Sequence, residues 1–378
     1  MGDRSVYTFG NEEGILFQYN SERQDEDISI ASETKMMGAT LIMRLVELGY
    51  FGLDDLLSRW LPWWPTDPTD SRSYITVRHC ISMTSGFYWI PDPRFTIQMD
   101  GRPMQFNSMR NIEKYQVDEK RCEVLNEIAC AQEVLNGTNH IAPPGTVWTY
   151  TGDHLRLVVA VMVSATGTDY NVLWRRHVFY RTSPKMSATK HYPEINFWDP
   201  AAEVISTPRD LQKFIAAYYN KKLISHESQK IIETESIRDT RLRWFIGEAR
   251  IARPLGFGNF GFDVWLSNPS FAVEAKEQNR NVWCGKSQSC AYAPSYFNSV
   301  MAVNKLDWQT FDNRNCTWKY SKTCAFYFHL QNVVEDASWE NNKRCKYVSA
   351  TAEEAILAIL QGEKWEAPPV RYSFADSN

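Results

Sequence analysis

Apolar residues after position 28 follow the spacing of a helix with one apolar face. They recur every three or four residues, and they are Met36, Met37, Leu41, Ile42, Leu45, Val46 and Leu48. Gly49 comes directly after them, and glycine commonly ends a helix. The pattern therefore predicts a helix that begins near Ser32 and stops at Gly49.

The rest of the chain mixes short strand patterns with helical ones. Weak alternation over 6–19 predicts a strand hairpin, and 307–348 reads as a strand followed by an elaborated loop. Thr76 and Thr207 are the expected N-caps of two helices, the first of which should stop at Ser85-Gly86. We expect a short helix that opens at 53–57 and is ended by the proline-rich segment at 62–68. Further helices are expected at 76–83, 120–135, 155–165, 170–179, 207–220, 226–236 and 351–360, and strands at 262–266, 283–289 and 298–303.

Ser32 and Lys35 form a Ser-x-x-Lys pair at the start of the first predicted helix. Residues three apart in a helix share a face, so the amine can take the proton of the serine hydroxyl. Burial lowers the pKa of a lysine because the charged form loses hydration, which suits a buried lysine to act as a base. The helix start also offers backbone N–H groups and a positive dipole end to an oxyanion.

A second literal match runs from Ser187 to Lys190, and no apolar periodicity follows it. We therefore place the nucleophile at Ser32. The alternative for Ser32 itself is an ordinary solvated helix start, which further motifs have to exclude.

The composition fits a chain with a sizeable core. At 378 residues with 43% hydrophobic and 13% aromatic content, it can bury one large or two moderate cores. A formal net charge of −4 disfavours a nucleic-acid-binding surface. The longest apolar run, 157–163, is far too short to span a bilayer. The tryptophans in 60–65 are expected to anchor core and loops, with a carbohydrate or lipid contact as the alternative.

Glycosylation sequons at Asn136 and Asn315 favour a secreted or extracellular protein. Residues 1–19 hold no apolar core of signal-peptide length, so we expect no leader within this chain. The eight cysteines contain no Cys-x-x-Cys pair, which disfavours a zinc or redox motif. The alternative is a set of buried free thiols in an intracellular, cytoplasmic protein.

If the cysteines are oxidised, Cys284 could pair with Cys290, and Cys316 with Cys324. We expect Cys122 and Cys130 not to pair, because a helix over 120–135 would separate them by roughly 12 Å.

A family resemblance emerges over 32–86. Leu45-Val46-Glu47-Leu48-Gly49, Leu53-Asp54-Asp55 and Ile75-Thr76-Val77-Arg78-His79 through Thr84-Ser85-Gly86 follow the Ser-x-x-Lys pair in order. This run resembles the serine β-lactamase and penicillin-binding-protein-like family, closest to its class C β-lactamase and esterase branch.

A second motif of that family, a Pro-Gly turn followed by Tyr-x-Asn, resembles Pro144-Gly145 through Gly152. The resemblance implies that Tyr150 relays a proton between nucleophile and leaving group. Gly152 stands where the family has an asparagine that orients the lysine and the substrate amide. The literal Tyr-x-Asn matches at Tyr218 and Tyr296 stand in the wrong order and context.

The third motif, Lys-Thr-Gly-Ser, resembles Lys286-Ser287-Gln288-Ser289, with Gln288 in place of glycine. The resemblance implies that Lys286 holds a substrate carboxylate and that Ser287 bonds the substrate. The N–H groups of Ser289 and Ser32 would form the oxyanion hole. A surface loop with a solvated lysine is the alternative for this stretch.

A glycine run over 256–261 matches Gly-x-Gly-x-x-Gly literally. A dinucleotide site needs a helix after the glycines, whereas a strand is expected at 262–266. We therefore read a glycine-rich strand entry and expect no nucleotide cofactor.

The resemblance implies an α/β (α+β) fold: an antiparallel sheet flanked by helices, plus a mainly helical lobe. We expect one domain, with 1–50 and 205–364 in the α/β lobe, 51–204 in the helical lobe and 365–378 as a loose tail. The implied activity is acyl transfer to Ser32 followed by hydrolysis of a small-molecule or peptide-like ester, amide or lactam. The alternative is an inactive relative that serves as a binding or structural module, and the oligomeric state stays open.

Overall fold

The structure is a computed structural model. It describes residues 6–11, 14–19, 25, 28–29, 33–88, 97–99, 102–104, 122, 125–149, 151–182, 201, 204–234, 236, 257–260, 265–267, 285–290, 297–304 and 325–332. The statements below concern this part of the chain.

Strands from both ends of the chain form one antiparallel sheet of seven strands in the order β2-β1-β13-β12-β11-β10-β9. Their bounds are β1 Val6–Asn11, β2 Gly14–Tyr19, β9 Phe257–Phe260, β10 Trp265–Ser267, β11 Gly285–Cys290, β12 Phe297–Asn304 and β13 Ala325–Asn332. The predicted hairpin over 6–19 is confirmed as β1 and β2. The glycine run itself forms β9, and the strand predicted at 262–266 overlaps β10 only at Trp265 and Leu266, since 261–264 lie outside the described residues.

Further two-stranded pairs lie outside this sheet. They are β3 Ile28–Ser29 with β8 Ile205–Ser206, β4 Phe87–Tyr88 with β7 Asn139–His140, and β5 Ile97–Met99 with β6 Arg102–Met104. The β3–β8 pair brings the chain just before the Ser-x-x-Lys motif against the chain that returns near residue 205.

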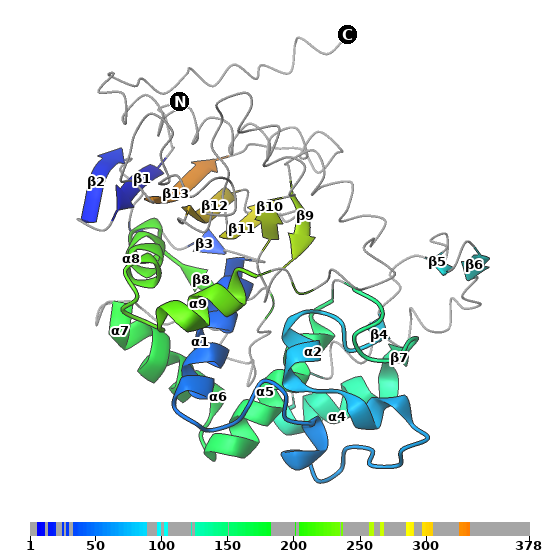
Figure 1. Ribbon diagram of the computed structural model, residues 1–378. Coiled ribbons are helices and arrows are strands. Elements are labelled where there is room, and N and C mark those ends of the chain that lie inside the picture. Colours follow the sequence, from blue (N-terminus) through cyan, green and yellow to red (C-terminus); the bar gives the residue numbers. More distant parts are fainter. Residues whose placement is uncertain are drawn as a thin grey trace.

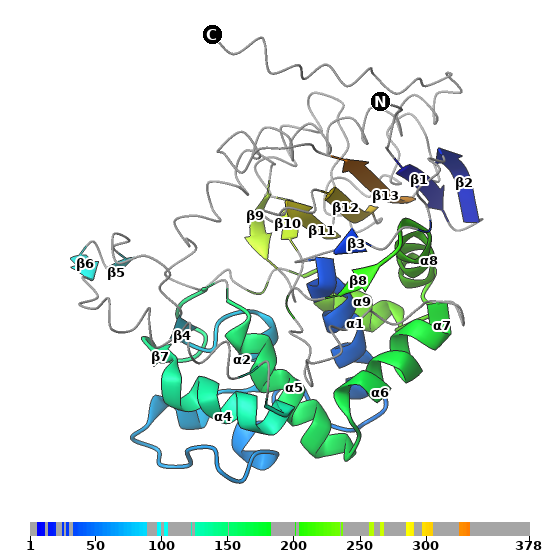
Figure 2. The same ribbon diagram turned by 180° about the vertical axis from the view of Figure 1, so that it is seen from behind.

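The helices lie on one side of the sheet and extend away from it. Their bounds are α1 Thr34–Glu47, α2 Val77–Ile81, α4 Glu127–Gly137, α5 Asp153–Thr166, α6 Tyr170–Trp174, α7 Tyr180–Thr182, α8 Pro208–Tyr219 and α9 His226–Ile232. Figures 1 and 2 show α1, α8 and α9 beneath the sheet and α2, α4 and α5 in a second group farther from it. α8 packs against β1, β12 and β13, whereas α4 and α5 pack on each other. The lobe boundaries stay a prediction.

Helix α1 is buried on every side along most of its length. Each residue from Thr34 to Met43 is buried, so the helix is central rather than a surface helix with one apolar stripe. Its end at Gly49 is confirmed: Gly49 has φ +77°, its N–H donates to the Val46 carbonyl, and the Tyr50 N–H donates to the Leu45 carbonyl. This pair of bonds is the Schellman arrangement that a left-handed glycine permits.

The helix predicted at 53–57 is wrong. The chain there makes an isolated bridge from Leu56 to Thr76 and then the 3₁₀ turn η2, Leu57–Arg59. The Asp55 carboxylate accepts from the Gly52 N–H at 2.8 Å and from the Trp60 indole N–H at 3.0 Å. A carboxylate that bonds nearby backbone competes with helix formation, and here it fixes a turn instead.

The capping predictions at Thr76 and Thr207 are confirmed. The Thr76 side chain accepts from the N–H of His79, whose ring in turn accepts from the Thr76 N–H, and Thr207 accepts from the N–H of Asp210. α2 nevertheless ends at Ile81, before the expected stop, and Met83 rather than a glycine takes the left-handed turn with φ +59°. α9 likewise ends at Ile232, four residues before the expected position.

The prediction that Cys122 and Cys130 do not pair is wrong, because these two residues form a disulfide with their Cα atoms 4.7 Å apart. α4 begins only at Glu127, after the N-cap Asn126, so Cys122 precedes the helix and can fold back on it. Cys80 is free and buried. The structure does not describe the side chains of Cys284, Cys290, Cys316 and Cys324, so their predicted pairings stay predictions. The helix predicted at 351–360 also lies outside the described residues.

Within the described part of the chain, no single helix is long and apolar enough to cross a membrane. One bent pair, Asp153–Thr166 with Tyr170–Thr182 at 85° to each other, meets the length and composition criteria jointly. The second member of the pair consists of α6, the π-helical turn η4 at Arg175–Phe179, and α7.

Candidate active site

Lys35 lies in the first turn of α1 and is almost fully buried, with 4% of its surface exposed. Its Nζ donates a hydrogen bond of 2.8 Å to the carbonyl oxygen of Ala201. One residue earlier, the Thr34 hydroxyl accepts from the Val204 N–H at 3.2 Å. The start of α1 is therefore joined to the returning chain at 201–204, and the amine has a fixed position. Ser32 itself lies just outside the described residues.

The chain that leads to the second motif is held against the chain that follows α2. Three backbone bonds join them: Ile141 N–H to Gly86 O at 2.8 Å, Gly145 N–H to Thr84 O at 2.8 Å, and Thr149 N–H to Met83 O at 3.0 Å. Gly86 has φ +90°, and a Cβ there would lie 2.0 Å from the Ala142 carbonyl oxygen. Only glycine therefore allows the two segments to approach this closely.

A buried histidine on α5 completes this connection. His154 Nε2 lies 2.8 Å from the Thr149 carbonyl oxygen and 3.1 Å from the Thr149 hydroxyl, and His154 Nδ1 lies 2.7 Å from the Ser85 hydroxyl. A carbonyl only accepts, so we assign the proton to Nε2, and Nδ1 then accepts from Ser85. The Thr149 hydroxyl donates to the Phe87 carbonyl at 2.7 Å.

His154 is neutral at physiological pH. Complete burial lowers the pKa of His154 to about 4, and the hydrogen bond to the Thr149 carbonyl only partly opposes this. Because the imidazole is neutral, one ring nitrogen donates and the other accepts, as the network requires.

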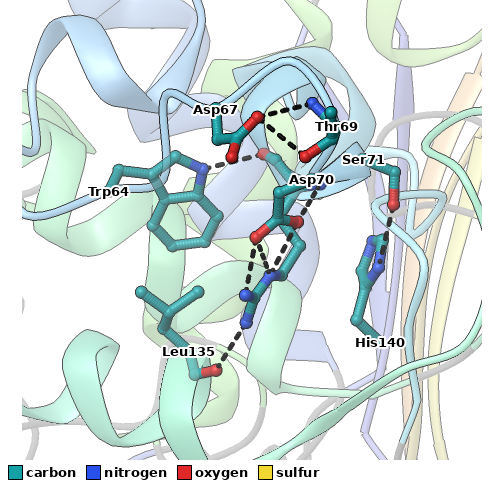
Figure 3. Close-up of polar contacts among 8 residues, drawn as sticks. Trp64, Asp67, Thr69, Asp70, Ser71, Leu135 and His140 are labelled. Atoms are coloured by element: carbon teal, nitrogen blue, oxygen red, sulfur yellow. Dashed lines mark hydrogen bonds and ion pairs between the residues drawn. The ribbon is translucent and has the colours of Figure 1, made fainter.

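A second set of contacts, centred on His140, supports the turn at Ser85. Figure 3 shows the part of this set that runs from Trp64 to His140. His140 Nε2 lies 3.1 Å from the Ser85 carbonyl oxygen, its Nδ1 lies 3.4 Å from the Ser71 hydroxyl, and its ring meets Phe87 edge-on. The Trp64 indole N–H donates to the Arg72 carbonyl at 2.9 Å, and the Arg72 side chain pairs with Asp70. Trp64 therefore anchors a loop, as expected for the tryptophans of 60–65.

Gly152 precedes α5 with φ −66° and ψ −21°, which any residue can adopt. The glycine is thus not required by the backbone, and the absent side chain is a chemical departure from the family motif. Directly after it, Asp153 and Arg156 form a buried ion pair of 3.0 Å, and the Thr138 hydroxyl donates to Asp153 at 3.0 Å. These contacts fix the first turn of α5.

The third motif forms β11, an interior strand of the sheet between β10 and β12. Lys286 pairs with Ala302 and Trp265, Ser287 with Met301, and Ser289 with Ser299. The expected strand is confirmed in place of the alternative surface loop. The side chains of Lys286, Ser287 and Ser289 lie outside what the structure describes, and so does Tyr150.

The structure thus locates Lys35 and Gly152 and leaves the roles of Ser32, Tyr150, Lys286, Ser287 and Ser289 as predictions. It adds Ser85, Thr149 and His154, which sequence reasoning missed. The one sequence signal for them is a lone histidine within the apolar pattern of α5. In the described residues, no group of three or more His, Cys, Asp or Glu side chains could hold a metal ion.

An antiparallel sheet from both chain ends, with helices against it and a buried Lys35 on a central helix, is the architecture of serine β-lactamases and penicillin-binding proteins. The chain belongs to the β-lactamase family, whose model matches residues 15–305. This membership confirms the α/β fold class. No curated protein matches the chain.

Solved structures share the fold at low sequence identity. A candidate β-lactamase from Bacteroides dorei is 17% identical, with 94% of this chain and 93% of that chain covered and a TM-score of 0.61. A D-amino acid amidase from Ochrobactrum anthropi is 17% identical, with coverage of 95% and 93% and a TM-score of 0.58. Simvastatin synthase (LovD) from Aspergillus terreus is 14% identical, with coverage of 94% and 94% and a TM-score of 0.59.

Proposed function

We propose that this protein is a serine hydrolase that acts through an acyl-enzyme on Ser32. Family membership supports an enzyme of the β-lactamase type. The observation that carries the proposal is the position of Lys35, buried in the first turn of α1 with its Nζ on the Ala201 carbonyl. A lysine kept for solubility would extend into water, whereas this amine is buried and fixed three residues after the serine in the sequence.

In the proposed reaction, Ser32 Oγ attacks the carbonyl carbon of an ester, amide or lactam, and its proton passes to the Lys35 amine. The N–H groups of Ser32 and Ser289 bind the oxyanion of the tetrahedral intermediate. The intermediate collapses, the bond to the leaving group breaks, and Tyr150 passes the proton from the Lys35 ammonium to the leaving group, which returns the Lys35 amine to its neutral form. Water then attacks the acyl-Ser32 ester, which releases the acid and restores the serine. Lys286 and Ser287 bind the substrate from β11.

The hydrogen bond from Lys35 to Ala201 offers a substitute for the family asparagine that Gly152 replaces. In the family that asparagine helps to orient the lysine, and Gly152 offers no such contact. Here the main-chain carbonyl of Ala201 orients the amine. Loss of the asparagine therefore affects the contact to a substrate amide more than the activation of Ser32. An amidase shares the fold, which fits an amide among the proposed substrates.

The test is labelling with a serine-reactive phosphonate, followed by peptide mapping and by turnover of an activated ester. We expect one adduct, on Ser32, and loss of both adduct and turnover in Ser32→Ala. Lys35→Met should slow labelling by roughly a hundredfold or more, since it removes the base. Ser187→Ala is the matched control, because Ser187 begins the other Ser-x-x-Lys match.

A binding or structural module is the second candidate, and Gly152 is the observation that favours it, since the backbone there would accept asparagine. Folded wild-type protein that forms no adduct on Ser32 and turns over no activated ester would contradict the hydrolase and support this module. Gly152→Asn sharpens the choice: in a hydrolase it should leave ester turnover intact and raise β-lactam turnover, and in a module it should change neither.

We also propose a secreted or extracellular location. The Cys122–Cys130 disulfide supports an oxidising compartment, and the sequons at Asn136 and Asn315 agree with it. A shift in mass after enzymatic deglycosylation of protein from its natural source would support this location. A carbohydrate-free protein with reduced cysteines would contradict it.

A further inference from the structure

Thr149, the residue before Tyr150, is held by hydrogen bonds at its N–H, its hydroxyl and its carbonyl. The Thr149 N–H donates to Met83 O, its hydroxyl donates to Phe87 O, and its carbonyl accepts from His154 Nε2. Thr149 and His154 are both buried. Every polar group of Thr149 therefore has a partner, and the partners come from two other segments of the chain.

The carbonyl bond matters most, because this carbonyl belongs to the peptide plane that leads into Tyr150. A peptide unit is planar, so a fixed carbonyl also fixes the direction of the following N–Cα bond. On the other side, Thr151 is buried and its hydroxyl accepts from the Asp153 N–H at 3.4 Å. The residue between them is therefore approached by fixed backbone from both directions.

We propose that His154, with Ser85 and Thr149, is a positioning residue that aims Tyr150 at the nucleophile. This inference rests on the proposed function, since it assigns the residues that hold the proposed proton relay in place. Ser85 fixes the orientation of the His154 ring by donating to Nδ1, and the ring then presents Nε2–H to the Thr149 carbonyl. His140 Nε2 lies within hydrogen-bond distance of the Ser85 carbonyl and supports the same residue through its main chain.

A proton relay has to lie within hydrogen-bond reach of both groups that it serves, so a small displacement is costly. A misplacement of about 1 Å can lower the rate on the order of a hundredfold. Removal of the carbonyl bond should therefore lower kcat and leave KM nearly unchanged, because ground-state binding does not depend on the relay. It should also shift the limb of the pH–rate profile that reports the relay.

The experiment compares Thr149→Val, Thr149→Ser, Ser85→Ala and His154→Gln for kcat, KM and the pH–rate profile on an activated ester. In a separate sample, wild type is tested for labelling of Ser32 by the phosphonate. We expect Ser85→Ala, which releases the ring that donates to the Thr149 carbonyl, to lower kcat by roughly 10- to 100-fold with a shifted profile. Thr149→Val keeps the carbonyl but removes the hydroxyl bond to Phe87 that also holds this backbone, and we expect a loss of the same order. Thr149→Ser keeps the hydroxyl, so its kcat should stay within about threefold of wild type. His154→Gln can still donate to the Thr149 carbonyl, so its kcat should lie between those of Thr149→Ser and Ser85→Ala.

Phe214→Leu is the control for stability alone, because Phe214 is buried on α8 and contacts none of these residues by hydrogen bond. It should lower Tm while its kcat and pH profile stay as in wild type. Folded Thr149→Val and Ser85→Ala with wild-type kcat and pH profile would overturn the inference and leave the hydrolase intact. Absence of the Ser32 adduct in wild type would instead overturn the hydrolase, and the inference with it.

Discussion

The two ends of the candidate site that the structure describes are held in different ways. The start of α1 belongs to a helix that is buried along most of its length in the apolar core, and hydrogen bonds from Lys35 to Ala201 and from Val204 to Thr34 tie it to main chain. The approach to α5 depends on a buried polar network of Ser85, Thr149 and His154. Apolar packing yields gradually to substitution, whereas a buried network fails when one member leaves the others without partners.

The largest expected effect comes from a side chain placed between Gly86 and Ala142, where the segments that carry the network of Ser85, Thr149 and His154 approach each other. Gly86→Ala adds a Cβ 2.0 Å from the Ala142 carbonyl at a φ of +90°. We expect a loss of roughly 3 kcal/mol or more in the free energy of unfolding, measured by denaturant titration.

Gly167→Ala is the matched control, since Gly167 has φ +62° and nothing within 4 Å of the added atom. It should cost about 1–2 kcal/mol for the left-handed conformation alone. Equal losses in the two variants would show that the close approach at Gly86 adds nothing.

The next effect is the acid sensitivity that His154 gives to the network of Ser85, Thr149 and His154. The pKa of His154 is about 4 in the folded protein against a reference of 6.5, so between these values the unfolded state binds the proton and the folded state does not. The stability from the neutral ring is therefore present above pH 6.5 and declines as pH falls to 4, by about 3 kcal/mol.

Denaturant titrations at pH 7 and pH 4 on wild type and His154→Gln measure this contribution. The variant should lack the loss that His154 causes, while the parallel losses from His79, His140 and His177 cancel in the comparison, since burial lowers the pKa of each of them too. The same pH dependence in both proteins would contradict the assignment to His154.

The smallest effect should come from a change at the start of α1. Thr34→Val removes the acceptor of the Val204 N–H but keeps the shape of the side chain. We expect a loss of about 1 kcal/mol and an unchanged acylation rate, because Ala201 still holds the lysine. A rate that falls as steeply as in Thr149→Val would remove the distinction between the two sides.

Local signals in the sequence predicted elements whose ends are set locally. Gly49 ends α1 and Thr207 begins α8, and each acts through hydrogen bonds within its own turn. The errors arose where a nearby side chain competed with the pattern. The Asp55 carboxylate accepts a hydrogen bond from the Gly52 N–H and fixes a turn where the sequence pattern predicted a helix. Asn126 caps α4, which therefore begins later than expected and leaves Cys122 outside it, within reach of Cys130.

The candidate site was predicted as far as motifs and family resemblance allowed, which includes Lys35 and the strand of the third motif. The support for the second motif was not predictable from local patterns. Ser85 and His154 are separated by 69 residues in sequence, and nothing in the neighbourhood of either residue indicates the other. Such a contact follows only from the tertiary fold, in which the close approach at Gly86 brings the two segments together.

The position of β1 in the sheet has a consequence for biosynthesis. β1 pairs with β2 on one side and with β13 on the other, and β13 begins only at Ala325. At about 5–20 residues per second, a ribosome needs on the order of 15–60 s to make the intervening chain. During this interval the hairpin presents an open strand edge, to which the strands of neighbouring nascent chains can add. The edge of β1 therefore lacks its partner strand until the far end of the sequence has been made.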